Sequence, residues 1–329
     1  MKAAVYHRFG EPAEVLHVEE VPPPKPRPGQ VRVRMLLSPI NPSDLLTVQG
    51  AYGKLPRLPA TPGYEGVGIV EENGGGLLGW RVLRRRVAVI NGQGGNWAEQ
   101  VVIPARQAVP VPADLPNEQV AAFFVNPATA LVMVQDVLKI PRGGWLLQTA
   151  AGSALGRMLI RLGKHLGFHT INVVRRSETA KELVALGGDV VIDTSRESLV
   201  QRVRELTKSE GVRYAIDAVG GRTASEVVQC LGANGHMLVY GTLAMEPMQF
   251  DQRLLIAGSK KLEGFWLSEW ARRQNPLTML RLFRRIAGLI RAGVLATDIG
   301  ATYPLEQVAE AVRKASEPGR SGKVLLKLG

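Results

Sequence analysis

A short glycine-containing turn is the first feature of the sequence that could do chemistry. The apolar run WLLQTA (145–150) is typical of a buried strand, and it leads through AAGSALGR (150–157) into an amphipathic stretch. Small residues at such a turn let the backbone approach a pyrophosphate, which binds at the N-terminus of the following helix. Only the last of the three usual glycine positions, Ala151, Ser153 and Gly156, is glycine here. The motif alone therefore fits a dinucleotide site and an ordinary tight turn equally well.

Two arginines end the next predicted strand, in NVVRRSE (172–178). NAD-binding units usually carry an acidic residue there, which accepts hydrogen bonds from the ribose hydroxyls. Guanidinium groups such as those of Arg175 and Arg176 instead bind a 2′-phosphate through charge-assisted bonds. The pair predicts NADPH as the cofactor, although a pair of solvated arginines is the alternative in this arginine-rich chain.

No metal-ligand set is apparent in the sequence. The single cysteine, Cys230, falls in a helical pattern typical of a buried, unreactive thiol, and one cysteine cannot form an intrachain disulfide. We therefore predict chemistry without zinc, because the five histidines also lack ligand spacing: His7, His17, His165, His169 and His236.

Alternating strands and helices must position the turn and the arginines. A mostly helical stretch over 117–138, interrupted near Pro127, opens this part of the chain. The alternation is typical of right-handed βαβ units, so we predict an α/β Rossmann domain with a doubly wound parallel sheet over residues 119–264. Strands are expected over 145–150, 169–175, 189–193, 213–220 and 236–241, and helices over 155–167, 177–188, 198–211 and 224–235.

The first 118 residues have a different pattern. Short apolar runs separated by proline and glycine clusters predict a small β-rich, barrel-like domain. A helix over 275–293 and a final strand over 322–328 are expected near the end of the chain. The N-terminal strands are expected over 31–38, 66–72, 86–91 and 98–103.

Composition narrows the class of protein. Of the 329 residues, 45% are hydrophobic and 21% are charged, which excludes collagen-like, disordered and low-complexity chains. No run approaches the ~18 apolar residues of a membrane span, and the N-terminus resembles a first strand rather than a signal peptide. We expect a cytoplasmic protein without a membrane partner.

The net charge is +12, because 41 Lys and Arg residues oppose 29 Asp and Glu residues. Such a charge fits either a solvated basic surface or an anionic partner, such as a phosphorylated cofactor, coenzyme A or an acidic carrier protein. Nucleic acid is the least favoured partner, since helix-turn-helix, zinc-finger and RRM signatures are absent. We interpret the arginines of 84–86 and of the helix over 276–292 as solvated.

Several motifs together resemble the zinc-free branch of the medium-chain dehydrogenase/reductase superfamily. Tyr64 stands where the zinc enzymes of this superfamily carry histidine, and Asn41 stands near the position of their cysteine. Within the branch, the 2-enoyl thioester reductases match better than the quinone oxidoreductases. The motifs are INPSD (40–44), VQGAYGKLPRLPA (48–60), GYEGVG (63–68), VNPATA (125–130), INVVR (171–175) and GFWLSEW (264–270).

The resemblance implies a fold and a site. A GroES-like catalytic domain over 1–118, completed by 265–329, would flank the Rossmann domain, with the active site in the cleft between them. Tyr52 corresponds to the family's catalytic tyrosine, although without the resemblance it would be read as a packing aromatic. The implied cofactor contacts are Asn126; Gly152, Ser153, Ala154, Leu155 and Gly156; Arg175, Arg176 and Ser177; Tyr240, Gly241, Thr242 and Leu243; Phe265, Trp266, Leu267 and Ser268; and Lys323.

Two departures from the family pattern stand out. The pyrophosphate turn, often rich in Asn and Gly, is Gly-Ser-Ala-Leu, and RVLRRRVAVI (81–90) has arginines where Gly-Asp is usual. An edge strand in LEGFWL (262–267) could pair across a two-fold axis, which predicts a homodimer.

The implied activity is NADPH-dependent reduction of an activated C=C bond. The expected substrate is a trans-2-enoyl thioester on coenzyme A or on acyl carrier protein. Two alternatives stay open: a quinone or unsaturated-ketone oxidoreductase, and an NADPH-binding protein that uses its basic surface to bind RNA.

Overall fold

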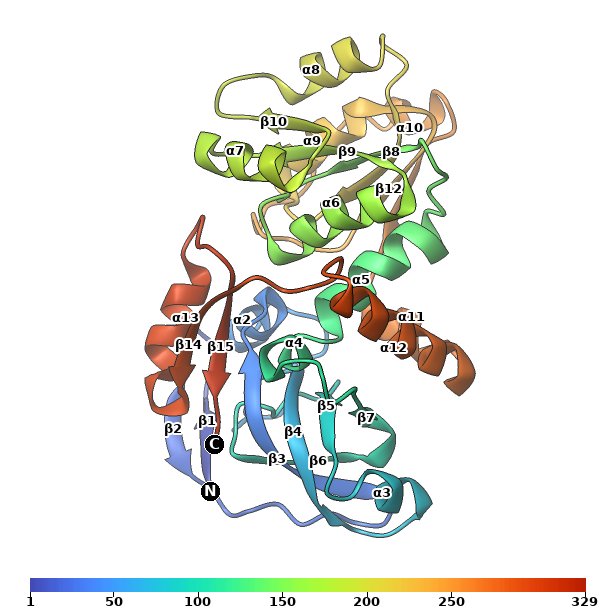
Figure 1. Ribbon diagram of the computed structural model, residues 1–329. Helices are drawn as coiled ribbons and strands as arrows, with labels where there is room; N and C mark the ends of the chain where they lie inside the picture. Colours follow the sequence, from blue (N-terminus) through green and yellow to red (C-terminus); the bar gives the residue numbers. More distant parts are fainter. The chain divides into compact units, whose positions relative to one another are not determined.

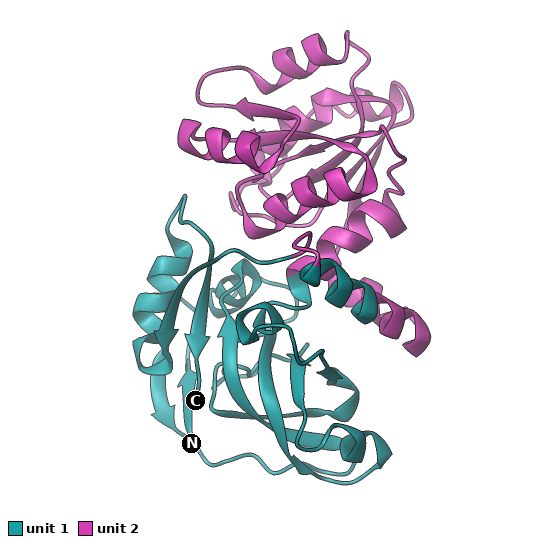
Figure 2. Ribbon diagram, viewed as in Figure 1, with its two compact units in different colours: residues 1–125, 283–291, 296–329 teal, residues 126–282, 292–295 magenta.

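The computed structural model describes residues 1–329, which form two compact units (Figure 2). Unit 1 comprises Met1–Val125, Phe283–Arg291 and Ala296–Gly329, and unit 2 comprises Asn126–Leu282 and Ala292–Leu295. The C-terminal segment thus belongs to the same unit as the first 125 residues. The units divide after residues 125 and 282, rather than at the predicted 118 and 264.

Aromatic packing accounts for the later division. The Phe283 ring packs against Phe123 and Phe124, with ring centroids 6.4 and 5.7 Å apart. The second half of helix α12 (Pro276–Arg291) therefore belongs to unit 1.

Unit 1 is built around a mixed seven-stranded sheet with the order β14-β15-β3-β4-β5-β7, and β6 pairs with β3 (Figure 1). Its inward side chains, such as Val33 and Met35, are fully buried around Trp97. The predicted N-terminal strands and the C-terminal strand are all present. The strands are β1 (Lys2–Val5), β2 (His17–Glu20), β3 (Gln30–Pro39), β4 (Glu65–Asn73), β5 (Arg86–Ile90), β6 (Gln100–Pro104), β7 (Ala108–Pro110), β14 (Ile299–Pro304) and β15 (Lys323–Lys327), and the helices are α1 (Pro12–Val15), α2 (Pro42–Val48), α3 (Leu77–Val82), α4 (Asn117–Ala121) and α13 (Val308–Ser316).

Unit 2 is a parallel six-stranded sheet with the order β10-β9-β8-β11-β12-β13. The chain runs outward from β8 to β10, returns to the centre, and runs outward again from β11 to β13. This is the predicted doubly wound Rossmann topology, with its switch point between β8 and β11. Its elements are α5 (Val125–Val132), a π-helical turn (Met133–Val137), β8 (Trp145–Gln148), α6 (Ala154–Leu166), β9 (His169–Val174), α7 (Ser177–Leu186), β10 (Val190–Asp193), α8 (Leu199–Leu206), β11 (Val212–Asp217), α9 (Gly221–Cys230), β12 (Leu231–Val239), α10 (Arg253–Ile256), β13 (Lys261–Gly264) and α11 (Leu267–Arg272).

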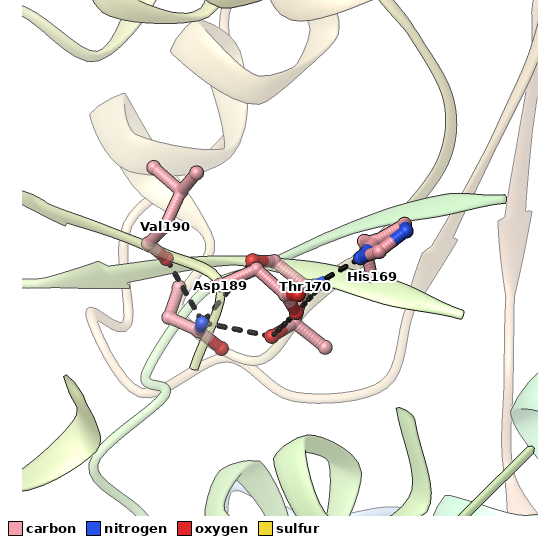
Figure 3. A network of polar contacts seen from close by, with 5 residues as sticks. His169, Thr170, Asp189 and Val190 are labelled. Atoms are coloured by element: carbon pink, nitrogen blue, oxygen red, sulfur yellow. Dashed lines mark hydrogen bonds and ion pairs between the residues drawn. The ribbon is translucent and has the colours of Figure 1, made fainter. Parts of the chain in front are cut away.

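A polar network fixes the amino ends of β9 and β10 (Figure 3). The Asp189 carboxylate accepts hydrogen bonds from Nδ1 of His169 (2.8 Å) and from the backbone N–H of Thr170 (2.9 Å). The side chain of Asn172 donates to the carbonyl oxygen of Val190 at 2.9 Å. These bonds set the register of the two strands from the end of the sheet opposite to the predicted cofactor turn.

The prediction of a helix through residue 235 is wrong, because helix α9 ends at Cys230 and β12 begins at Leu231. The start of β12 packs tightly against the turn that precedes β11. A Cβ at Gly232 would lie only 2.2 Å from the carbonyl oxygen of Glu210, and Asn234 adopts a left-handed φ of 55°. This local packing, and not helix propensity, sets the start of the strand.

No helix of the chain is long and apolar enough to cross a bilayer.

Candidate active site

The predicted cofactor residues of unit 2 follow the carboxyl ends of its strands, except for Asn126 in helix α5. Gly152–Gly156 follow β8, Arg175–Ser177 follow β9, Tyr240–Leu243 follow β12 and Phe265–Ser268 follow β13. Because the strands are parallel, all four loops lie along one edge of the sheet. Nucleotides bind at this edge in doubly wound folds.

The turn after β8 offers backbone donors to an anion. Ser153 caps helix α6: its hydroxyl accepts from the N–H of Gly156 (3.1 Å), and its carbonyl accepts from the N–H of Arg157 (3.0 Å). The first-turn N–H groups of Ala154 and Leu155 have no acceptor within the helix. They therefore point out of the helix N-terminus, where the helix dipole favours a phosphate.

Gly156 allows helix α6 to approach the end of β8. A Cβ at this position would lie 2.4 Å from the carbonyl oxygen of Ala151 and 2.7 Å from its Cα. Since both are backbone atoms, a side chain could be accommodated only by moving the helix. Gly156 thus fulfils the role of the third glycine in a dinucleotide turn, that of close helix–strand packing.

Replacing Gly156 by alanine should lower the free energy of unfolding by about 1–3 kcal/mol and weaken NADPH binding. Urea unfolding and cofactor titration measure the two effects. Gly288→Ala is the matched control, since Gly288 lies in helix α12 and a Cβ there meets no atom within 4 Å. The free energy of unfolding of this control should rise by up to about 1 kcal/mol. Equal effects of the two substitutions would contradict the packing role of Gly156.

A hydrogen-bonded brace joins β8 to β11 at the switch point. The hydroxyl of Thr149 donates to the buried Asp217 carboxylate at 2.6 Å, and the N–H of Gly220 donates to the same carboxylate at 2.8 Å. Burial raises the pKa of Asp217, and these bonds oppose the rise. The N–H of Tyr240 donates to the carbonyl oxygen of Asp217 at 2.9 Å. The brace therefore ties together the segments that follow β8, β11 and β12.

The sequence interpretation missed this brace, although a signal for it was present. Thr149 and Asp217 are polar residues at the ends of otherwise apolar strand patterns, WLLQT and YAID. Polar side chains at such places are buried and need partners.

The predicted 2′-phosphate site has two exposed arginines, Arg175 and Arg176, at the end of β9. The third predicted member, Ser177, donates its hydroxyl to the Asp193 carboxylate at 2.7 Å. Hydrogen bonds from Ser195 and Ser177 lower the pKa of Asp193. The two guanidinium groups, rather than the Ser177 hydroxyl, are thus the groups that suit a phosphate.

In unit 1, Tyr52 lies in the loop after helix α2, half-buried beside Tyr64. The two ring centroids are 6.2 Å apart. The hydroxyl of Thr47 donates to the carbonyl oxygen of Ser43 (2.8 Å), so the Tyr64 hydroxyl is the donor in its 2.7 Å bond to Thr47. Burial raises the pKa of Tyr64 to about 12. Tyr64 is therefore a neutral phenol whose proton is committed to Thr47.

A buried polar network lies under these tyrosines, and sequence reasoning missed it as a unit. The side chain of Asn41 accepts from Nζ of Lys323 (2.7 Å) and donates to Glu65 (3.0 Å). Glu65 also accepts from the backbone N–H groups of Phe124 (3.0 Å) and Val125 (2.9 Å). Lys323, predicted as a cofactor contact, is 3% exposed and bonded inside unit 1.

The Asp44 carboxylate is the second acid of this network. It accepts from the N–H groups of Asn41 (2.8 Å) and Tyr64 (3.1 Å), and so fixes the start of helix α2 and the residue before β4. Burial raises the pKa values of both carboxyl groups, and that of Asp44 reaches about 7. Burial lowers the pKa of the Lys323 ammonium group to about 8.

Asn41 and Tyr64, which the resemblance places near and at the positions of zinc ligands, make hydrogen bonds within the protein. No group of three His, Cys, Asp or Glu side chains is arranged to hold a metal ion.

Comparison with known proteins places this site in a family. The family model for the alcohol dehydrogenase GroES-like domain matches residues 27–113, and the model for zinc-binding dehydrogenases matches residues 154–285. The mitochondrial enoyl-[acyl-carrier-protein] reductase of Xenopus tropicalis is 34% identical and covers 99% of this chain and 95% of the relative. The chain belongs to the medium-chain dehydrogenase/reductase superfamily.

Further relatives refine the membership. The mitochondrial enoyl-[acyl-carrier-protein] reductase of Homo sapiens is also 34% identical, over 99% of this chain and 88% of its own length. The quinone oxidoreductase of Escherichia coli, solved in complex with NADPH, has a TM-score of 0.92 at 26% identity and covers 99% of this chain and 100% of its own. This medium-chain reductase therefore falls in the zinc-free branch, and it is an NADPH-dependent oxidoreductase. The predicted fold class, family and cofactor are confirmed.

Proposed function

We propose that the protein reduces the C=C bond of a trans-2-enoyl thioester. NADPH, when bound, supplies a hydride, which is added at the β-carbon. The thioester oxygen then carries enolate charge until the α-carbon takes a proton. A positioned donor is what this chemistry requires of the protein.

Tyr52 is the residue to which we assign this donor role. Of the two neighbouring phenols, Tyr64 gives its proton to Thr47 and is held by that bond. Tyr52 lies in the motif that carries the family's catalytic tyrosine, on the loop that helix α2 positions. The place of Tyr52 in this motif, on the loop after helix α2 and beside Tyr64, is the observation that carries the proposal. Relatives named enoyl reductases, 34% identical over nearly the whole chain, support it.

The predicted cofactor residues are compatible with NADPH. The N–H groups of Ala154 and Leu155 suit the pyrophosphate, and Arg175 and Arg176 suit the 2′-phosphate. Roles for Asn126, Tyr240–Leu243 and Phe265–Ser268 stay predictions, as does any cofactor contact of the buried Lys323.

A quinone oxidoreductase is the second candidate, and the TM-score of 0.92 to the Escherichia coli enzyme favours it. Such an enzyme needs the same cofactor but no donor to an enolate, because a quinone can take protons from water. NADPH consumption with crotonyl-CoA and with naphthoquinone discriminates the two candidates. Turnover of naphthoquinone alone would contradict the thioester proposal, and turnover of neither with salt-sensitive RNA binding would favour the RNA-binding alternative.

Changing Arg175 to aspartate should weaken NADPH binding by about 10–150-fold and spare NADH, because one charge-assisted hydrogen bond contributes roughly 1.5–3 kcal/mol. Titration with both cofactors measures the effect. Arg213→Asp is a matched control, since Arg213 is an exposed arginine near the amino end of β11. Equal losses for NADPH and NADH would show that Arg175 does not contact the 2′-phosphate.

Three further assignments stay predictions of ours: a role in fatty-acid metabolism, a cytoplasmic location and a homodimer. The dimer would use β13 (Lys261–Gly264), the outermost strand of the parallel sheet, whose free edge can pair with a second copy. Sedimentation of the full chain tests the dimer.

A further inference from the structure

Helix α3 carries an exposed apolar surface bordered by arginines. Leu77, Leu78 and Trp80 are 76%, 54% and 66% exposed, although such residues are usually buried. Arg81, Arg84 and Arg85 are also exposed. We call these six residues the α3 patch. It includes the arginines that replace the family's usual Gly-Asp, and the proposed reaction does not use it.

Local packing holds the α3 patch out in solvent. Gly79 and Val82 form the buried face of the helix, and a Cβ at Gly79 would lie 2.0 Å from the side-chain oxygen of Asn73. Leu77, Trp80 and Arg81 lie three and four residues apart, which places them together on the opposite face. The apolar side chains therefore protrude because the other face of the helix is fixed.

The charged residues of the α3 patch and of the sequence on either side of it, residues 73–98, are all positive. No acidic residue occurs between Glu72 and Glu99 in the sequence. The nearest acids on β4 are already paired: Glu71 with Arg34 at 2.7 Å and Glu72 with Arg32 at 2.8 Å. The arginines of the patch thus suit an anionic surface.

The position of α3 separates the patch from the tyrosines. Figure 1 shows α3 within unit 1, where it connects the end of β4 to the start of β5, and Tyr64 directly precedes the other end of β4. Nine extended residues span about 30 Å. A carrier protein docked on α3 would have to deliver its thioester along the whole strand, so the patch does not suit substrate delivery.

We propose that the α3 patch binds the surface of an anionic phospholipid bilayer. Trp and Leu side chains that protrude beside arginines suit the headgroup region, where the apolar groups enter and the guanidinium groups contact phosphates. This contact is peripheral, so it is compatible with the absence of a spanning helix. The expectation of no membrane partner concerns a spanning segment, whereas the α3 patch would make a surface contact only.

The test is co-sedimentation of the full chain with vesicles of phosphatidylcholine, with and without phosphatidylglycerol. The protein should bind only the anionic vesicles, and added salt should weaken binding. Changing Arg81, Arg84 and Arg85 together to glutamine should reduce binding about 100-fold, at roughly fivefold per arginine. Trp80→Ser should reduce it by at least about tenfold, and the blue shift of tryptophan emission on vesicles should be absent in Trp80→Phe.

Matched controls separate the patch from overall charge. Changing the exposed Arg281, Arg284 and Arg285 of helix α12 to glutamine removes the same charge elsewhere, and should leave binding within about twofold. All variants should retain NADPH turnover, which verifies their fold.

Three results would overturn the proposal. The first is failure of the wild-type chain to bind anionic vesicles at low salt. The second is an equal loss of vesicle binding in the α12 control, which would mean that net charge alone, and not the α3 patch, drives binding. The third combines two observations: the wild type does not bind vesicles, and the α3 variants lose self-association or binding to acyl carrier protein. That result would show that the α3 patch contacts another protein instead of a bilayer.

Discussion

Turnover of crotonyl-CoA should fall by about 10²–10⁴ when Tyr52 is replaced by phenylalanine, the usual range for a positioned acid. The change keeps the ring beside Tyr64 and removes only the hydroxyl. A phenol is protonated at neutral pH and can donate without activation. NADPH affinity should barely change, because the hydroxyl acts on substrate charge that develops only in the transition state. Steady-state kinetics and cofactor titration provide the measurements.

Tyr64→Phe is the matched control for this experiment. It removes a hydroxyl of the same kind, but one whose proton is held by Thr47, so its effect on turnover should be much smaller. Reduction of naphthoquinone by the Tyr52 variant should also be less affected. Near-normal crotonyl-CoA reduction would remove Tyr52 from the mechanism, together with the main residue-level reason for preferring a thioester over a quinone.

The Rossmann unit could be predicted because its determinants are local in sequence. Helix α6 begins at its cap Ser153 and ends at Gly167, which takes a left-handed φ of 83°. In strand β9, Ile171, Val173 and Val174 are buried with their neighbours, as is typical of strands covered on both faces. The parallel topology then places the loop residues along one edge, so a motif-based assignment of those loops needed no tertiary information.

The buried network of unit 1 could not be predicted in this way. Asn41 and Lys323 are 282 residues apart in the chain, and Asn41 and Glu65 are 24 apart. Nothing local distinguishes a buried lysine on the last strand from an exposed one. In the motif GYEGVG the resemblance points to Tyr64, whereas the adjacent Glu65 side chain makes more buried hydrogen bonds than the Tyr64 side chain does.

This network leads to the second large expected effect. Lys323→Met keeps the approximate volume of the side chain and removes the ammonium group from two buried carboxyl groups and from the Asn41 oxygen. The free energy of unfolding should fall by about 3–5 kcal/mol near pH 8, the usual cost of leaving a buried charge unpaired. Lys327→Met is the control, because Lys327 lies on the same strand but is exposed. Denaturant unfolding of both variants provides the comparison.

The pH dependence distinguishes this electrostatic cost from a loss of packing. Burial raises the pKa of Asp44 to about 7, so between about pH 4 and 7 the folded state binds more protons than the unfolded state. Stability from this group therefore falls as the pH rises through that window. Without Lys323 the carboxyl pKa should rise further, and protonation below pH 7 should relieve the unpaired charge. The loss in Lys323→Met should consequently be smaller at pH 5 than at pH 8. A loss that is equal at both values would instead assign Lys323 a packing role, and the network would then not depend on its charge.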